Sequence, residues 1–452
     1  MKWMMTYRQM KRMGSTLVPS RHVHHFSLRR HFSFFIYITY FSLLISHLLL
    51  TSCSGGSDST IEEPTPYDGP SVLSIYVYAP GQSVPTRGNT GQVNAAAAED
   101  AIHTLQIWVY SHETTPKLVT YFKTNAFQQD PQKTDDTYKF ELPIDDTFAD
   151  SNPDNRPTVD VYVLANVTGN NCGLDFNENT TKDALENAVL AEGYFGLSTP
   201  VTEVPYEGLP MSGVLRGMTI TGSKPVLTLR ESTVSEQMAK VKMARVVSKV
   251  RFVFSCSTDF DGLKITSVNF DEGMIPTQEY LFLDQDYTYE DNRYKIGNTY
   301  NDAVASLFSI DETAICADPA HYAWDRLQND QPDCTAQDYE DLIADGLTIH
   351  EGETGPRLTE RCLYLRESNK QLSGTIYYKV KEKGAANYGD EEPPVAFKMV
   401  GPEDPTEWQP YFSRNHTWIV YAYLAWAKMR VVDVHFKDWE TTDPGEHSLY
   451  NW

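Results

Sequence analysis

Hydrophobic and polar residues alternate with a two-residue period through most of the chain beyond residue 70. In the first such segment, 72–78, Leu73, Ile75 and Val77 share one face of an extended chain. The pattern recurs between turn residues and predicts further strands at 102–110, 159–166, 226–229, 250–255, 278–283, 362–365, 374–381, 395–400, 418–425 and 429–437. The body of the protein is therefore predicted to be all-β.

Only one or two segments favour helices. Residues 181–192 predict a short helix that Gly193 would end, and residues 336–344 predict a second. The segment 209–213 reads as a turn. At 240–251 basic and apolar residues interleave, which indicates an amphipathic strand with a charged outer face.

The first 52 residues differ from the rest of the chain. They contain seven basic residues and no Asp or Glu, followed by an apolar run over about 32–50 and then Leu50-Thr51-Ser52-Cys53. This order is typical of an export signal, with small residues before the cleavage site. A membrane-spanning helix is the alternative reading of the apolar run. The ending resembles a bacterial lipobox, which implies cleavage between Ser52 and Cys53 and a lipid on Cys53.

The predicted exported chain is strongly acidic. The whole sequence has 38 basic and 61 acidic residues, so losing seven basic residues leaves 31 against 61, a formal charge of −30. Such a charge disfavours nucleic acid and anionic membrane surfaces as partners. Residues 54–70 are rich in Ser, Gly, Pro and acidic residues and are predicted to be a tether.

No arrangement of residues indicates catalysis, a metal or a cofactor. The sequence has no Gly-rich phosphate loop, no Gly-x-Ser-x-Gly elbow and no Cys-x-x-Cys, and the histidines beyond Cys53 are scattered singly. An enzyme is therefore not expected. Of the five cysteines that follow Cys53, only Cys316 and Cys334 lie close in sequence, and small buried thiols are favoured over that bridge.

Several segments together resemble the fimbrillin family, the pilin subunits of type V pili. They are the lipobox, the Thr86-Arg87-Gly88 that follows the first strand, Val161–Asn166 with Thr168-Gly169, the turn at 210–213, the basic segment at 240–254, and Arg414-Asn415-His416 before the last two strands. Each motif is weak alone. Their order and spacing carry the resemblance over nearly all of the exported chain.

The resemblance implies two transthyretin-like β-sandwich domains, expected here at 88–238 and 239–452, after a signal peptide (1–52) and a lipidated propeptide (53–87). It also implies a mechanism. An arginine-specific protease would cut between Arg87 and Gly88 and release the first strand, and a strand from another subunit would fill the vacated groove.

In the family the donor strand is C-terminal, which assigns that role here to Val432, Val434 and Phe436, with Trp439 at its end. The expected protein is a structural fimbrial subunit, placed first in the outer membrane by its lipid and then in the surface fimbria, with other pilin subunits as partners. Shaft and tip positions both stay open. The alternative is a surface glycan-binding lipoprotein that does not polymerise, with Trp108, Trp324, Trp408 and Trp426 as candidate stacking residues.

Overall fold

The computed structural model of the protein describes only part of the chain, namely residues 70–78, 98–125, 137–150, 152–190, 193–231, 238–283, 294–296, 299–300, 306–310, 317–318, 347–348, 351, 358–399, 412, 414–425 and 428–438. Several predicted features lie outside these residues: the signal and lipid site (Ser52, Cys53), the cleavage site (Arg87, Gly88), Trp439, Cys316, Cys334, three of the four tryptophans (Trp324, Trp408, Trp426) and the helix at 336–344.

The described residues form mainly β-strands, which confirms the predicted all-β class. The strands of the N-terminal half are β1 (Ser71–Tyr78), β2 (Leu105–Ser111), β3 (Leu118–Thr124), β4 (Thr137–Ile144), β5 (Thr158–Ala165), β6 (Val189–Leu190), β7 (Met211–Ser223), β8 (Val226–Arg230), β9 (Lys240–Lys242) and β10 (Ala244–Arg245). The helical elements are η1 (Pro153–Asn155), α3 (Gly169–Cys172) and α4 (Lys182–Glu186).

The strands of the C-terminal half are β11 (Val247–Ser257), β12 (Phe260–Phe270), β13 (Glu279–Leu283), β14 (Tyr294–Ile296), β15 (Ala317–Asp318), β16 (Thr359–Arg366), β17 (Ser373–Glu382), β18 (Val395–Lys398), β19 (His416–Ala425) and β20 (Lys428–Asp438). All described elements belong to one compact unit, Tyr67–Trp452.

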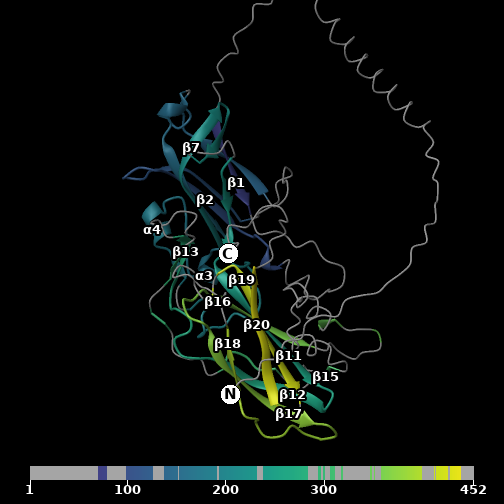
Figure 1. Ribbon diagram of the computed structural model, residues 1–452. Helices are drawn as coiled ribbons and strands as arrows, with labels where there is room; N and C mark the ends of the chain where they lie inside the picture. Colours follow the sequence, from purple (N-terminus) through teal and green to yellow (C-terminus); the bar gives the residue numbers. More distant parts are fainter. Residues whose placement is uncertain are drawn as a thin grey trace, which may run out of the picture. The chain divides into compact units, whose positions relative to one another are not determined.

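The N-terminal strands build one nine-stranded sheet in the order β3-β2-β5-β7-β8-β1-β4, with β9 beside β1 and β10 beside β7. Figure 1 shows β1, in purple, within the group of strands that contains β2 and β7. Its apolar core includes Leu73, Ile75 and Val77 of β1, which confirms the alternation expected for the first strand. The chain leaves this sheet between Arg245 and Val247.

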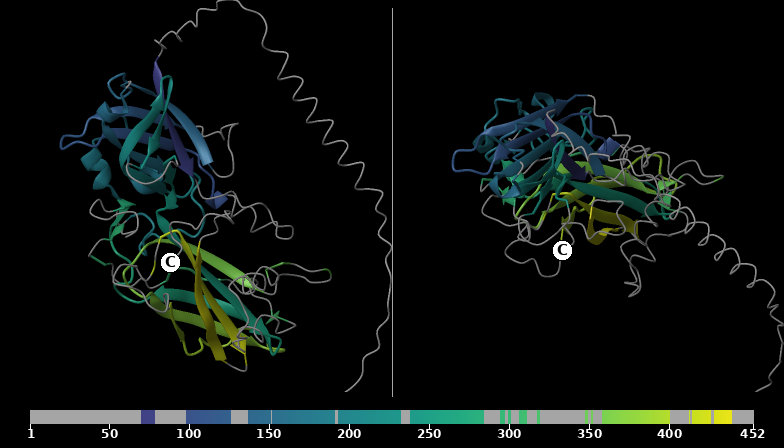
Figure 2. Two further views of the ribbon diagram at one scale, coloured as in Figure 1. Left: turned by 45° about the horizontal axis from the view of Figure 1, so that its top comes forward. Right: turned by 90° about the horizontal axis from the view of Figure 1, so that it is seen from above.

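The C-terminal strands build a sheet in the order β15-β11-β19-β20, with β16 beside β11, and a three-stranded sheet β12-β17-β18. Side chains of β11, β12, β17 and β19 contribute to a common core, in which Phe252 and Trp418 are among the largest buried residues. Figure 2 shows β19 and β20 as neighbouring yellow strands, in agreement with their antiparallel register. A further small sheet pairs β6 with β13 and β14.

Two local predictions were wrong. The segment predicted as a helix at 181–192 is helical only over Lys182–Glu186, because Asn187 caps the helix and Val189–Leu190 then pairs with β13. The segment 209–213 is not a turn, since β7 begins at Met211 and runs to Ser223. The Gly213 position is needed for packing instead, because a Cβ there would lie 2.6 Å from the carbonyl oxygen of Lys242.

Candidate functional site

Strand β1 occupies an internal slot of the N-terminal sheet. One edge pairs antiparallel with β4 at all eight residues, from Ser71 opposite Ile144 to Tyr78 opposite Thr137. The other edge pairs parallel with β8 over Val72–Ser74 and with β9 over Tyr76–Tyr78. Taking β1 away would therefore leave two unpaired strand edges and an opening into the core.

The side chains of β1 fit the slot closely. Leu73, Ile75 and Val77 are at most 1% exposed and belong to the core of the sheet. Ser71 and Ser74 are equally buried, at 0% and 1% exposed, although Ser74 faces away from the three apolar residues by the two-residue period. Neither serine hydroxyl has a hydrogen-bond partner among the described residues. The burial of both serines could not be predicted, because a serine in an alternating strand gives no sign of burial.

A pair of carboxylates anchors the chain just before β2. Glu99 accepts a hydrogen bond from the Lys249 Nζ at 2.7 Å and one from the Tyr364 hydroxyl at 2.5 Å. Asp100 pairs with the Arg245 guanidinium. Burial alone would raise the pKa of Glu99, but the charge and hydrogen bond of Lys249, together with the hydroxyl of Tyr364, outweigh it and hold that pKa below its ordinary value. We call Glu99 and Asp100 with these partners the carboxylate clamp.

The prediction of a charged outer face at 240–251 was wrong for the two arginines of the segment, while Lys240, Lys242 and Lys249 are half-buried. Arg245 is 0% exposed and Arg251 is 6% exposed. Arg251 makes a two-point ion pair with Glu360, at 2.7 and 2.9 Å. Its charge lowers the pKa of Glu360 despite the burial of that carboxyl, which acts in the opposite direction. The acidic partners come from residues distant in sequence, so the segment by itself could not reveal them.

Two of the motifs that carried the resemblance contain an asparagine with left-handed backbone geometry. Asn166, with φ of 57°, is fully buried and follows β5. Its Oδ1 accepts from the backbone N–H groups of His103 and Thr104, and its Nδ2 donates to the carbonyls of Ala101 and Leu209. Asn415, with φ of 58°, accepts from both the backbone N–H and the Nη1 of Arg245.

Arg414, the first residue of the Arg-Asn-His motif, lies in a buried charge cluster. Its guanidinium donates to the Glu367 carboxylate at 2.6 and 2.9 Å and to the Tyr280 carbonyl at 2.8 Å. Glu279 lies 2.9 Å from the same guanidinium, and both carboxylates are fully buried. Burial, opposed by Arg414 and reinforced by Glu367, raises the pKa of Glu279 well above its ordinary value. These motifs therefore fix the fold and do not form a reactive site.

The predicted donor strand, β20, pairs with β19 along its whole length, from Asp438 opposite His416 to Lys428 opposite Ala425. Val434 lies opposite Val420, and Phe436 lies opposite Trp418. A register shift falls between Tyr421 and Ala422 and passes over Val432. The structure therefore places the three predicted donor residues on the last strand of a sheet within this chain.

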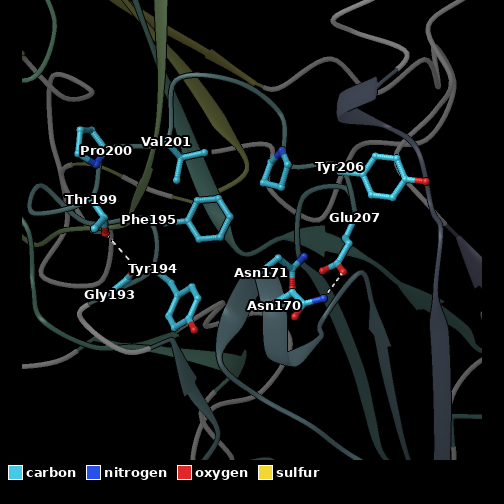
Figure 3. A pocket seen from close by; sticks show the side chains of 11 residues that line it. Asn170, Asn171, Gly193, Tyr194, Phe195, Thr199, Pro200, Val201, Tyr206 and Glu207 are labelled. Carbon is cyan, nitrogen blue, oxygen red and sulfur yellow. Dashed lines mark hydrogen bonds between the residues drawn. The ribbon is translucent and has the colours of Figure 1, made fainter.

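A pocket of about 460 Å³ lies between α3 and the segment 193–207. Figure 3 shows Asn170 and Glu207 facing each other in it, and the Asn170 Nδ2 donates to the Glu207 Oε1 at 2.7 Å. Hydrogen bonds from the Thr168 hydroxyl and from Asn170 lower the pKa of Glu207. Tyr206 is 97% exposed at the rim, where its ring stacks on His103 at 6.5 Å between centroids. These residues come from α3 and from the segment 193–207, which are separated in sequence, so their proximity could not be predicted.

The remaining predictions about side chains have mixed outcomes. Trp108, a candidate for stacking on sugars, is 0% exposed, and its indole nitrogen donates to the Asn177 carbonyl, so it is a core residue. Cys172 and Cys256 are buried thiols, as favoured from the sequence, whereas Cys362 is a free thiol that is only half-buried. Among the described residues there is no group of metal-ligating side chains, and none of their helices combines the length and apolar character that crossing a bilayer requires.

Comparisons with known proteins found a family model and several solved structures that are similar to this chain. A sequence model described as "Major fimbrial subunit protein (FimA)" matches residues 71–245. The solved structure of the tip fimbrial protein Mfa3 from Porphyromonas gingivalis is similar, with 12% identity and a TM-score of 0.40, over 82% of this chain and 100% of that one. A fimbrial assembly protein from Parabacteroides distasonis is also similar, with 10% identity and a TM-score of 0.37, over 82% of this chain and 99% of that one.

The comparison with curated proteins gives no match. The family match covers β1 to β10, which include all the strands of the nine-stranded sheet that contains the slot of β1 and also β6. The resemblance to fimbrial subunits seen in the sequence is thereby confirmed for residues 71–245, which match the model of the major fimbrial subunit protein.

Proposed function

We propose that this protein is a fimbrial subunit that is exported as a lipoprotein on Cys53 and activated by cleavage after Arg87. Cleavage frees residues 53–87, which include β1, and the slot then accepts a strand from another subunit. The carrying observation is that β1 is internal to its sheet and yet is the first strand of the described chain. A single cut after Arg87 leaves it attached to the sheet only by non-covalent contacts.

The slot suits strand exchange energetically. An incoming strand recovers ladder bonds to β4 on one edge and to β8 and β9 on the other. Three apolar side chains at the positions of Leu73, Ile75 and Val77 contribute roughly 1.5–3 kcal/mol each when fully buried. A strand that supplies all three would therefore be held firmly, and the lipid would serve delivery of the precursor.

Arg87→Ala is expected to abolish incorporation into fimbriae. The uncut chain keeps β1 in its slot, so no strand from another subunit can enter. The measurement is an immunoblot of unboiled surface fractions from producing cells, in which the wild-type chain should run in high-mass assemblies and the variant as a monomer that stays with the membrane. Arg87→Lys is the matched control for charge and should also remain monomeric under an arginine-specific protease. High-mass assemblies formed by Arg87→Ala would contradict the proposal.

A second candidate function, binding of a neutral saccharide, is favoured by the pocket between α3 and the segment 193–207. The Asn170 amide oxygen and the Glu207 carboxylate offer acceptors to vicinal hydroxyls, and the exposed ring of Tyr206 offers a stacking surface. The net acidity of the chain disfavours sialylated or sulfated sugars.

Tyr206→Ala and Asn170→Ala are each expected to weaken binding to immobilised neutral oligosaccharides by about tenfold, which corresponds to ~1.4 kcal/mol. Asn179→Ala, an exposed asparagine outside the pocket, is the control and should bind as wild type does. An array of neutral and sialylated glycans, with a lysine-rich peptide as a cationic probe, checks the expectation. Preference for the peptide, or equal binding by all variants, would exclude the saccharide.

A further inference from the structure

The slot of β1 imposes a residue pattern on any strand that fills it, and the chain's own C-terminal strand does not meet that pattern. Leu73, Ile75 and Val77 require large apolar residues at alternate positions. Ser71 and Ser74 require small uncharged ones, since both positions are as buried as the apolar three. A larger or charged side chain at either serine position would have to displace packed neighbours or lose its hydration.

The β20 sequence meets only the apolar half of this requirement. When Val432, Val434 and Phe436 take the places of Leu73, Ile75 and Val77, Arg430 falls at Ser71 and Asp433 falls at Ser74. Both charged residues would then stand at positions that are at most 1% exposed. Shifting the strand by two residues in either direction puts Asp438 at Val77 or Arg430 at Leu73, which are both core positions.

The pairing of β20 within its own sheet also disfavours its donation to a second copy. Its backbone is paired with β19 at ten positions, so donation would first require that ladder to open. The gain on entering the slot of a second copy would be reduced by the cost of burying two charges. At these two positions even the serine hydroxyls have no hydrogen-bond partner among the described residues.

We infer that the slot selects a strand from a different subunit, with small residues at the positions of Ser71 and Ser74, and rejects the C-terminal strand of a second copy of this chain. This inference rests on the proposed strand exchange and adds the identity of the partner. The chain then accepts a strand but does not polymerise with itself, which corresponds to a terminal or minor position in a mixed filament.

Displacement of the cleaved β1 fragment tests the selection. The exported chain is cut at Arg87, with the fragment that contains β1 fluorescently labelled and still seated in the slot. Three synthetic peptides then compete for the slot: the β1 sequence Ser71–Tyr78, the β20 sequence over 430–437, and the same β20 peptide with Arg430→Ser and Asp433→Ser. Fluorescence anisotropy reports the released fragment at each peptide concentration.

The β1 peptide is expected to displace the fragment, and the native β20 peptide to need at least about a hundredfold higher concentration. The doubly substituted peptide should act within about tenfold of the β1 peptide. If the native β20 peptide displaces the fragment at a concentration within tenfold of that of the β1 peptide, the inferred selection is wrong, while strand exchange itself is not contradicted. If the two serine substitutions do not improve displacement by the β20 peptide, the burial of charge at these positions is not the reason for the selection. Failure of the β1 peptide itself would overturn the exchange and, with it, the inference.

Discussion

Arg414→Met is expected to lower the free energy of unfolding by about 3–5 kcal/mol, because removing one partner of a buried ion pair leaves the other charge uncompensated. The guanidinium contacts two fully buried carboxylates, Glu367 and Glu279, and also the Tyr280 carbonyl. Methionine matches the length of the side chain but supplies no donor. Urea denaturation followed by tryptophan fluorescence measures the change.

Two further variants show whether the uncompensated charge is the cause. Adding Glu367→Gln to Arg414→Met removes the stranded charge and should restore part of the lost stability. Lys224→Met breaks the surface pair with Asp146, whose side chain is 73% exposed, and should change stability by less than about 1 kcal/mol. If Arg414→Met behaves like Lys224→Met, the buried cluster does not stabilise the fold as described.

Asn166→Ala is expected to lower the free energy of unfolding by about 5–6 kcal/mol. The substitution removes four hydrogen bonds to buried or half-buried backbone groups, at ~1 kcal/mol each or more where a partner is left unsatisfied. It also places an alanine at a φ of 57°, a left-handed geometry that costs about 1–2 kcal/mol for an ordinary residue. The free energy of unfolding in urea is again the measured quantity.

Asn166→Gly separates the two contributions. Glycine adopts the left-handed geometry without strain but lacks the amide, so it should be less destabilising than alanine by about 1 kcal/mol. Asn179→Ala, at an exposed position, should have little effect. Equal stability of the alanine variant and the wild type would show that the side-chain amide of Asn166 does not hold the strand end.

The alternation of β1 was predictable because an apolar side chain favours burial whatever residues surround it. The burial of Ser74 and of Arg245 was not predictable, because the burial of a polar residue depends on residues elsewhere in the chain. Lys249 meets Glu99 across 150 residues, and Arg245 meets Asn415 across 170. The short helix α4 was overestimated for a related reason, since pairing of Val189–Leu190 with β13 overrides the local helical preference.

The candidate site likewise has features that were predictable from the sequence and features that only the fold reveals. The residue pattern of β1 marked a strand, and the resemblance to the family marked it as removable. The two-sided pairing of β1 could not be predicted, because β4, β8 and β9 begin between 66 and 169 residues after the start of β1, and alternation does not reveal such a topology. The pocket between α3 and the segment 193–207 was unpredictable too, since its polar groups become neighbours only when separate loops fold together.

The carboxylate clamp holds the start of the chain that remains after cleavage. It thereby limits which strand can enter the vacated slot first. In the proposed cleaved form, residues 88–98 become a new N-terminal arm, held at Glu99 and able to span at most about 40 Å when extended. An arm tethered so close would compete at a high effective concentration with any partner. Its sequence, Gly-Asn-Thr-Gly-Gln-Val-Asn followed by four alanines, has Val93 as its single large apolar residue. The arm therefore does not supply the three apolar residues that the slot requires, and filling of the slot depends on the concentration of strands from other subunits.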